Sequence, residues 1–290
     1  MTEDKPTIQS LSTQENPTWC TSCGDFSILS VLKTALVDLG IEQKDVLIVS
    51  GIGCGSKLPH YLKTYGFEGL HGRVMPVATG AKIANTKLKV IGVAGDGDSL
   101  GIGGNHFIHS LRRNLDITYI IQDNAVYGLT KGQTSPTSQK GFKSNSTPLG
   151  VIEEAFNPMA MGISGGATYV ARGFAFDIPH LKKIITDAIS HRGFSIVDVL
   201  QPCKTFNKVN TLEFYKENIY RLEDKGHDPK DKKTAIERSR EWGKKSIPIG
   251  LFYKEDKPTY EDGIPQATHK PLTEHNISKV DISKFLKQFK

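Results

Sequence analysis

The hydrophobic positions of this chain form two kinds of segment. Some are short continuous apolar runs, and others carry an apolar residue at every third or fourth position. Continuous runs are typical of strands buried on both faces, whereas the spacing of three and four predicts amphipathic helices. The runs predict strands at 46–50, 89–94, 117–121, 168–171 and 195–200. The spaced segments predict helices at 25–40, 76–85, 103–113, 152–161 and 178–191.

The order of these elements predicts the fold class. Strands and helices alternate, which is the pattern of an α/β, doubly wound and mainly parallel sheet with helices on both faces. We predict three regions: a mobile N-terminal segment at 1–16, one binding domain at 17–210, and a C-terminal extension at 211–290. The extension is expected to hold a helix near 212–222 and then an extended tail. A long polar loop is expected at 124–148.

Composition limits the class of protein. The 290 residues are 38% hydrophobic and 23% charged, which is ordinary for a globular chain. No apolar run approaches the roughly 18 residues of a membrane-spanning helix, and the N-terminus lacks a signal-peptide pattern, so a cytoplasmic protein without membrane contact is expected. A net charge of +6 gives no indication of nucleic-acid binding.

Polar and small residues follow the predicted strands. Gly95-Asp96-Gly97 comes directly after one strand, and Asn124 follows the next strand along the chain. Parallel strands bring their carboxyl ends to one edge, where ligands bind. Carboxylate and amide oxygens are donors that Mg²⁺ accepts, and a diphosphate can complete its shell. The alternative interpretation is that both segments are only tight turns.

The four cysteines point to a second kind of site. Cys20 and Cys23 form a Cys-x2-Cys pair, while Cys54 and Cys203 each follow a predicted strand. A chain of this length needs no disulfides for stability, so the thiols are available as ligands. Four thiolates can hold a zinc ion or an iron–sulfur cluster, and their spacing does not separate the two. Two isolated cysteines are also common as small buried apolar residues.

Six motifs in order give the chain a recognisable resemblance. They resemble those of the beta subunits of 2-oxoacid:ferredoxin oxidoreductases, over about residues 17 to 210. The motifs are Trp19-Cys20-Thr21-Ser22-Cys23-Gly24-Asp25, Gly51-Ile52-Gly53-Cys54, His71-Gly72-Arg73, Gly95-Asp96-Gly97-Asp98, Asn124-Ala125-Val126-Tyr127-Gly128-Leu129-Thr130 and Gln201-Pro202-Cys203.

The resemblance implies a thiamine diphosphate-binding fold and a set of cofactors. Asp96, Asn124 and the Val126 carbonyl would bind Mg²⁺, and Cys20, Cys23, Cys54 and Cys203 would hold one [4Fe–4S] cluster. The cofactor would be lined by Ile52, Gly53, Cys54, Gly55, His71, Gly95, Gly97, Asp98, Gly128 and Leu129.

The resemblance also implies partners. The diphosphate-binding half of the cofactor site would lie on this chain, and the pyrimidine-binding half on an alpha subunit. The complex would oxidatively decarboxylate a 2-oxoacid, such as pyruvate or 2-oxoglutarate, with coenzyme A as acyl acceptor and ferredoxin as electron acceptor. Two alternatives are a non-oxidative thiamine diphosphate enzyme, similar to acetolactate synthase, and a non-catalytic subunit stapled by zinc.

Some positions depart from the family pattern or are less specific. Thr21 and Ser22 replace the usual Pro-Gly of the first cysteine motif, and Lys204 replaces a proline. Lys57 and Lys131 resemble basic residues that meet the substrate carboxylate in some members, but each can equally be a solvated surface lysine. His71 is expected to contact the substrate oxygen, with a supporting position behind the site as its alternative.

Overall fold

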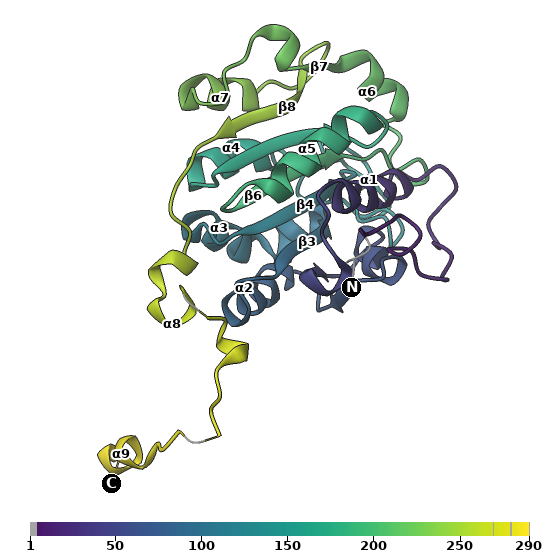
Figure 1. Ribbon diagram of the computed structural model, residues 1–290. Coiled ribbons are helices and arrows are strands. Elements are labelled where there is room, and N and C mark those ends of the chain that lie inside the picture. The colour runs from purple at the N-terminus through teal and green to yellow at the C-terminus, as the bar shows by residue number, and fades with distance from the viewer. Residues whose placement is uncertain (1–4, 269, 279, 290) are drawn as a thin grey trace.

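The computed structural model of the protein describes residues 5–268, 270–278 and 280–289. Eight strands form one sheet in the order β2-β1-β3-β4-β6-β5-β8-β7 (Figure 1). All pairs are parallel except β5 with β8. The strands are β1 (Val46–Ser50), β2 (Tyr65–Glu68), β3 (Lys89–Gly95), β4 (Ile117–Asp123), β5 (Tyr169–Phe174), β6 (Ser195–Leu200), β7 (Ile219–Arg221) and β8 (Ile247–Lys254).

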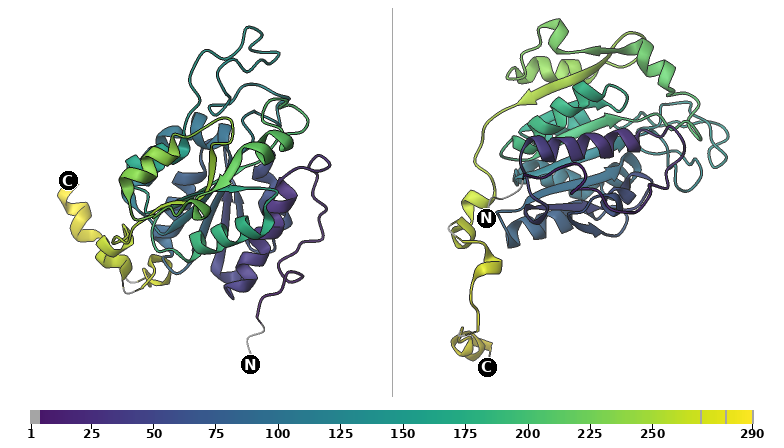
Figure 2. Two further views of the ribbon diagram at one scale, coloured as in Figure 1. Left: turned by 90° about the horizontal axis from the view of Figure 1, so that it is seen from above. Right: turned by 45° about the vertical axis from the view of Figure 1, so that its right-hand side comes forward.

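Helices cover both faces of the sheet, as the α/β pattern predicts (Figure 2). One face packs against α1 and α5, and the other packs against α2, α3, α4 and α7. The side chains of β1 illustrate why, because Val46 and Ile48 enter the first core while Leu47 and Val49 face the second. The helices are α1 (Asp25–Asp38), α2 (Val74–Ala84), α3 (Gly104–Arg113), α4 (Pro158–Gly165), α5 (Ile178–Ser190), α6 (Leu212–Asn218), α7 (Lys232–Ser239), α8 (Pro265–Thr268) and α9 (Ser283–Leu286).

The strand order sets the position of the candidate site. Because β1, β3, β4 and β6 are neighbours and parallel, their carboxyl ends lie side by side at one edge. The segments that follow these four strands begin at Gly51, Asp96, Asn124 and Gln201. Each carries glycine, cysteine or a polar residue that the sequence analysis singled out. In the described part of the chain, no helix is long and apolar enough to cross a membrane.

The C-terminal extension differs from its prediction. Instead of only a helix and an extended tail, it supplies β7 and β8, and the buried β8 pairs antiparallel with β5 inside the sheet. A prediction based on a parallel pattern misses this, because β8 contacts a strand far away in sequence. After β8 the chain leaves the sheet, and the segment that ends in α9 extends away from the body (Figure 1).

One predicted helix begins later than expected, and one strand was not predicted. The helix predicted at 152–161 begins only at Pro158, where the Asn157 side chain accepts a hydrogen bond from the Ala160 N–H and caps it. The edge strand β2 is exposed along its length and lacks the apolar run that would reveal it. In the N-terminal segment that is expected to be mobile, Leu11 is fully buried and its carbonyl accepts a hydrogen bond from the Lys63 N–H. Residues 1–4 lie outside the described residues.

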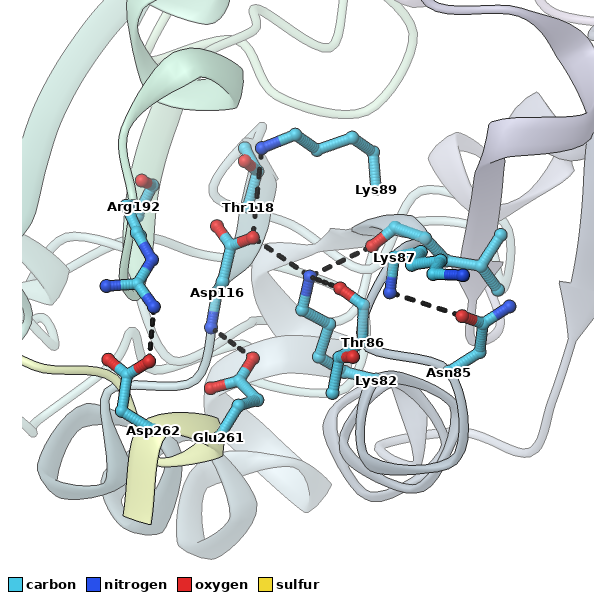
Figure 3. A network of polar contacts seen from close by, with 12 residues as sticks. Lys82, Asn85, Thr86, Lys87, Lys89, Asp116, Thr118, Arg192, Glu261 and Asp262 are labelled. Atoms are coloured by element: carbon cyan, nitrogen blue, oxygen red, sulfur yellow. Dashed lines mark hydrogen bonds and ion pairs between the residues drawn. The ribbon is translucent and has the colours of Figure 1, made fainter. Parts of the chain in front are cut away.

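A polar network holds the start of the tail at the edge opposite the candidate site (Figure 3). Lys82 is buried, and its Nζ donates to the carbonyls of Thr86 and Leu88 and lies 2.9 Å from Asp116 Oδ2. The Asp116 N–H in turn donates to Glu261 Oε1 at 3.0 Å. The network therefore ties residues after β8 to the loop between α3 and β4.

Candidate functional site

A cavity of about 300 Å³ opens at the carboxyl ends of β1, β3 and β4. Every predicted cofactor-binding residue and all three predicted magnesium ligands line it. The lining residues are Ile52, Gly53, Cys54, Gly55, His71, Gly95, Asp96, Gly97, Asp98, Gln122, Asn124, Val126, Tyr127, Gly128, Leu129 and Thr130. The topology thus gathers segments that are widely separated in sequence around one space, which we call the first cavity.

Asp96 is the buried carboxylate of the first cavity. Its Oδ2 accepts hydrogen bonds from the hydroxyls of Ser135 at 2.5 Å and Thr137 at 2.6 Å. Burial raises the pKa of Asp96 to about 6, against the lowering effect of these two hydroxyls. A bound cation would offset the cost of burying this charge.

Asn124 and Val126 form a tight turn beside Asp96. The Asn124 side-chain oxygen accepts the Val126 N–H at 3.1 Å, and Ala125 adopts a positive φ of 54°. A carbonyl oxygen has two lone pairs, so the Asn124 amide oxygen keeps capacity for a metal ion. An aspartate, an amide oxygen and a backbone carbonyl at one edge are a donor set that suits Mg²⁺.

Asp98 joins three segments of the cavity wall. Its Oδ1 accepts the N–H groups of Gly72 at 2.6 Å and Ile52 at 3.3 Å, and it lies 2.9 Å from His71 Nδ1. Burial raises the pKa of Asp98, which these two N–H groups and His71 oppose. Because His71 Nδ1–H faces the carboxylate, its Nε2 is the ring nitrogen left for another partner.

A second cavity, of about 50 Å³, contains all four cysteines in its wall. It shares Cys54, Asn124 and Gly128 with the first cavity. A Cβ atom at Gly128 would lie 3.7 Å from Cys54 Sγ and 3.8 Å from Cys203 Sγ, which is van der Waals contact with both sulfurs. Because Cys54 lines both cavities and Gly128 has no side chain, these two sulfurs lie close to the first cavity.

The cysteine environment is partly buried and polar. Cys23 Sγ lies 3.2 Å from the buried Asp25, and the Gln201 Nε2 donates to the same sulfur at 3.3 Å. Burial and the charge of Asp25 raise the pKa of Cys54 to about 11 and that of Cys23 further. A bound cation would favour the thiolate form of these cysteines.

The arrangement of the cysteines does not suit a single metal ion. Among residues 5–268, 270–278 and 280–289, no three His, Cys, Asp or Glu side chains are arranged to hold one ion. The cysteines nevertheless line one cavity. An iron–sulfur cluster binds its thiolates on different iron atoms, so it accepts sulfurs that are more widely spaced than those around a single zinc ion.

Two predicted catalytic residues lie outside both cavity walls. The half-buried Lys57 donates from Nζ to Thr18 Oγ1 at 3.1 Å, and its charge opposes the raised pKa of Cys54. Lys131 is exposed, with a positive φ of 78°, at the turn where the Lys131 N–H bonds the Gly128 carbonyl. Of the three predicted catalytic side chains, only His71 lines the first cavity.

Several polar residues of the site were missed by the sequence analysis. Ser135 and Thr137 return from the long loop to Asp96, and Tyr127 donates from its hydroxyl to the Gly97 carbonyl at 3.0 Å. Gln122 lies in the wall, on β4. The length of the loop after β4 could have indicated these residues in the sequence, since loops of that length in a compact domain are often functional.

Comparison with known protein families divides the chain into two matched parts. Residues 51–199 match the family described as thiamine pyrophosphate enzyme, C-terminal TPP binding domain. Residues 203–269 match the family described as the C-terminal part of the pyruvate ferredoxin oxidoreductase beta subunit. The first match spans the loops after β1, β3 and β4, and the second begins at Cys203.

Similar proteins cover most of the chain. The 2-oxoacid:ferredoxin oxidoreductase subunit beta of Sulfolobus sp is 48% identical, over 85% of this chain and 85% of that protein. The subunit beta of 2-oxoacid:ferredoxin oxidoreductase 1 of Aeropyrum pernix is 45% identical, over 89% and 85%. A solved 2-oxoglutarate:ferredoxin oxidoreductase from Magnetococcus marinus, with 2-oxoglutarate, coenzyme A and succinyl-CoA bound, superimposes with a TM-score of 0.90 at 36% identity, over 99% and 97% of the two chains.

Proposed function

Because the chain belongs to the family of 2-oxoacid:ferredoxin oxidoreductase beta subunits, we propose that it acts with an alpha subunit in the coenzyme A-dependent oxidative decarboxylation of a 2-oxoacid. The cofactors of this proposal are thiamine diphosphate, Mg²⁺ and one [4Fe–4S] cluster. One observation supports this proposal most directly. The cavity with the magnesium donors and the cavity with the four cysteines share a wall at Gly128.

The first cavity is the proposed diphosphate site. Asp96, Asn124 and the Val126 carbonyl would hold Mg²⁺, and the small residues after β1 and β3 would approach the diphosphate oxygens. The match to a thiamine pyrophosphate-binding domain over these loops supports this assignment. The hydroxyls of Ser135 and Thr137 fix the Asp96 carboxylate, which leaves its other oxygen for the metal.

The second cavity is the proposed cluster site. Cys20, Cys23, Cys54 and Cys203 line it, and Cys54 and Gly128 also line the first cavity. When bound, thiamine diphosphate supplies an electron sink for decarboxylation, and the cluster accepts the released electrons one at a time. Electron transfer from thiamine diphosphate to the cluster requires a short distance between the two cofactors.

The chain's own residues would position the reaction. The Asp98 carboxylate holds His71 at Nδ1, so that Nε2 can hydrogen-bond an oxygen of the substrate. A role for Lys57 or Lys131 at the substrate carboxylate stays a prediction, since neither lines the first cavity. The positive net charge favours the docking of an acidic ferredoxin, an effect that salt would weaken.

Three related proteins support the substrate class. The solved Magnetococcus marinus enzyme carries 2-oxoglutarate, coenzyme A and succinyl-CoA, and the Sulfolobus and Aeropyrum pernix proteins are named for 2-oxoacids as a class. We therefore propose 2-oxoacids, with pyruvate and 2-oxoglutarate as the first substrates to test.

The decisive experiment uses the complex of this chain and its alpha subunit, purified together without oxygen. Iron, sulfide, zinc and thiamine diphosphate are measured per complex, followed by turnover of a 2-oxoacid panel with coenzyme A and ferredoxin. The proposal predicts four irons and four sulfides per beta chain, bound thiamine diphosphate, and ferredoxin reduction that requires coenzyme A. Thiamine diphosphate without iron would instead identify a non-oxidative enzyme. Zinc without thiamine diphosphate would identify a non-catalytic binding subunit that zinc stabilises.

A further inference from the structure

Gln122 is a buried amide without a partner in the wall of the first cavity. It is 1% exposed, and neither its Nε2 nor its Oε1 has a hydrogen-bond partner among the residues that the structure describes. Its side chain lies across Gly55, where a Cβ atom would come 1.3 Å from Oε1. The glycine at position 55 therefore gives the amide its place on the cavity wall.

The position of Gln122 on β4 is one that an apolar side chain would fit. Alternate residues of a strand share a face, so Gln122 points to the same side as Ile120, which belongs to the core under α1 and α5. A buried primary amide that makes no hydrogen bond costs folding free energy, whereas an apolar residue there would not. The cost is offset when a ligand pairs with the amide.

The neighbours of Gln122 indicate which ligand. In the register of the sheet, Gln122 lies opposite Gly95, the residue before Asp96, and its side chain contacts the loop after β1 at Gly55. The amide thus stands between the metal donors and the glycine loop. Within the described residues, no lysine or arginine lines this cavity. An anion bound here therefore depends on the metal ion and on neutral N–H donors.

We infer that Gln122 is a cofactor-binding residue whose Nε2–H donates to an oxygen of the diphosphate held at Asp96 and Asn124. This inference rests on the proposed function, in which a magnesium diphosphate occupies the first cavity. It adds a contact that the glycine and aspartate motifs do not contain. The diphosphate offers only acceptors, which the amide nitrogen matches, and Oε1 remains for a bound water.

The test compares cofactor affinity and stability in the complex stripped of Mg²⁺ and thiamine diphosphate. Gln122→Leu removes the amide at similar size, and titration calorimetry measures the binding of thiamine diphosphate with Mg²⁺. We expect about tenfold weaker binding or more. Gln122→Glu should weaken binding further, because a carboxylate repels the diphosphate. The thermal midpoint of the stripped Gln122→Leu complex should be unchanged or higher, since an unpaired amide has been removed.

Two controls make the result specific. Gln201→Leu changes another buried glutamine at a strand end, but one that lines only the second cavity, and its affinity for thiamine diphosphate should stay within about twofold of the wild type. Magnesium pyrophosphate is the second probe, and its affinity should fall in Gln122→Leu by the same factor as that of thiamine diphosphate. Gln122→Met repeats the test if the leucine variant does not fold.

The possible results distinguish a failure of the proposed function from a failure of the assignment of Gln122. Wild-type complex that fails to bind thiamine diphosphate contradicts the proposed function. Wild-type binding that Gln122→Leu leaves unchanged overturns the inference alone. A loss for thiamine diphosphate without a loss for pyrophosphate also overturns it, because the contact would then be to the organic part of the cofactor.

Discussion

The hydroxyl of Thr137 lies 2.6 Å from Asp96 Oδ2 and 2.7 Å from Asp123 Oδ1, and so joins two buried carboxyl groups. One hydroxyl proton can be donated to only one of them at a time. Burial, together with the charges of Asp198 and Asp96, raises the pKa of Asp123 well above its ordinary value. Asp96 lines the first cavity, so the Thr137 hydroxyl helps to hold its carboxyl group there.

The first prediction concerns this hydroxyl. Thr137→Val keeps the shape of the side chain and removes the bond to Asp96, so the carboxylate loses one of its two hydroxyl donors. We expect Mg²⁺-dependent binding of thiamine diphosphate to weaken by about tenfold, which corresponds to about 1.4 kcal/mol. Calorimetric titration of the complex measures it. Thr130→Val is the matched control, because Thr130 also lines the cavity but donates to Gln133. Equal losses in both variants would contradict the assignment.

The second prediction is that thiamine diphosphate and the proposed cluster can be lost independently of each other. Asp96→Ala should abolish the retention of thiamine diphosphate and leave the visible absorption of the cluster, because Asp96 is not part of the wall that holds the four cysteines. Cys203→Ala, prepared without oxygen, should bleach that absorption because it removes a thiolate from the cluster. Absorption spectra and thiamine analysis of both complexes test this. Normal cofactor retention in Asp96→Ala, or an unchanged spectrum in Cys203→Ala, would remove the corresponding ligand.

The third prediction concerns the hydrogen bond from Gln201 to Cys23. An N–H donor to a cluster thiolate stabilises the reduced, more negative state. Gln201→Leu should therefore lower the reduction potential of the cluster by roughly 40 mV, if the bond contributes about 1 kcal/mol to a one-electron couple. A potentiometric titration followed by electron paramagnetic resonance measures the shift. Gln43→Leu serves as the reference because Gln43 lines neither cavity, and a shift of the same size there would show that the effect is not specific to Gln201.

The fourth prediction concerns stability far from the site. Lys82→Met leaves Asp116 without its buried partner and two backbone carbonyls without a donor. We expect a loss of about 3 kcal/mol in the free energy of unfolding, or roughly 6–10 °C in the thermal midpoint. Lys89→Met is the control, because Lys89 is more exposed and lies 3.7 Å from the same carboxylate, so less than about 1 kcal/mol should be lost. Thermal unfolding followed by circular dichroism compares them. A loss for Lys82→Met no larger than that for Lys89→Met would contradict this account.

The correct and incorrect predictions have different physical origins. The strands at 46–50 and 195–200 were predicted at their observed bounds, because a buried parallel strand is a local apolar run. The buried β8 was missed because its place beside β5 depends on a non-local pairing. Leu11 shows the same limit, since a single leucine in a polar segment carries no periodic signal, yet it is buried in the core.

The sequence by itself determined which candidate groups meet at one edge, because Cys54, Cys203 and the Asp96 and Asn124 oxygens follow strands whose carboxyl ends a parallel sheet must bring together. Only the tertiary structure decided how those groups are held and what separates them. The hydroxyls of Ser135 and Thr137, the unpaired amide of Gln122 and the glycine wall at Gly128 depend on contacts between distant segments, and no local pattern encodes such contacts.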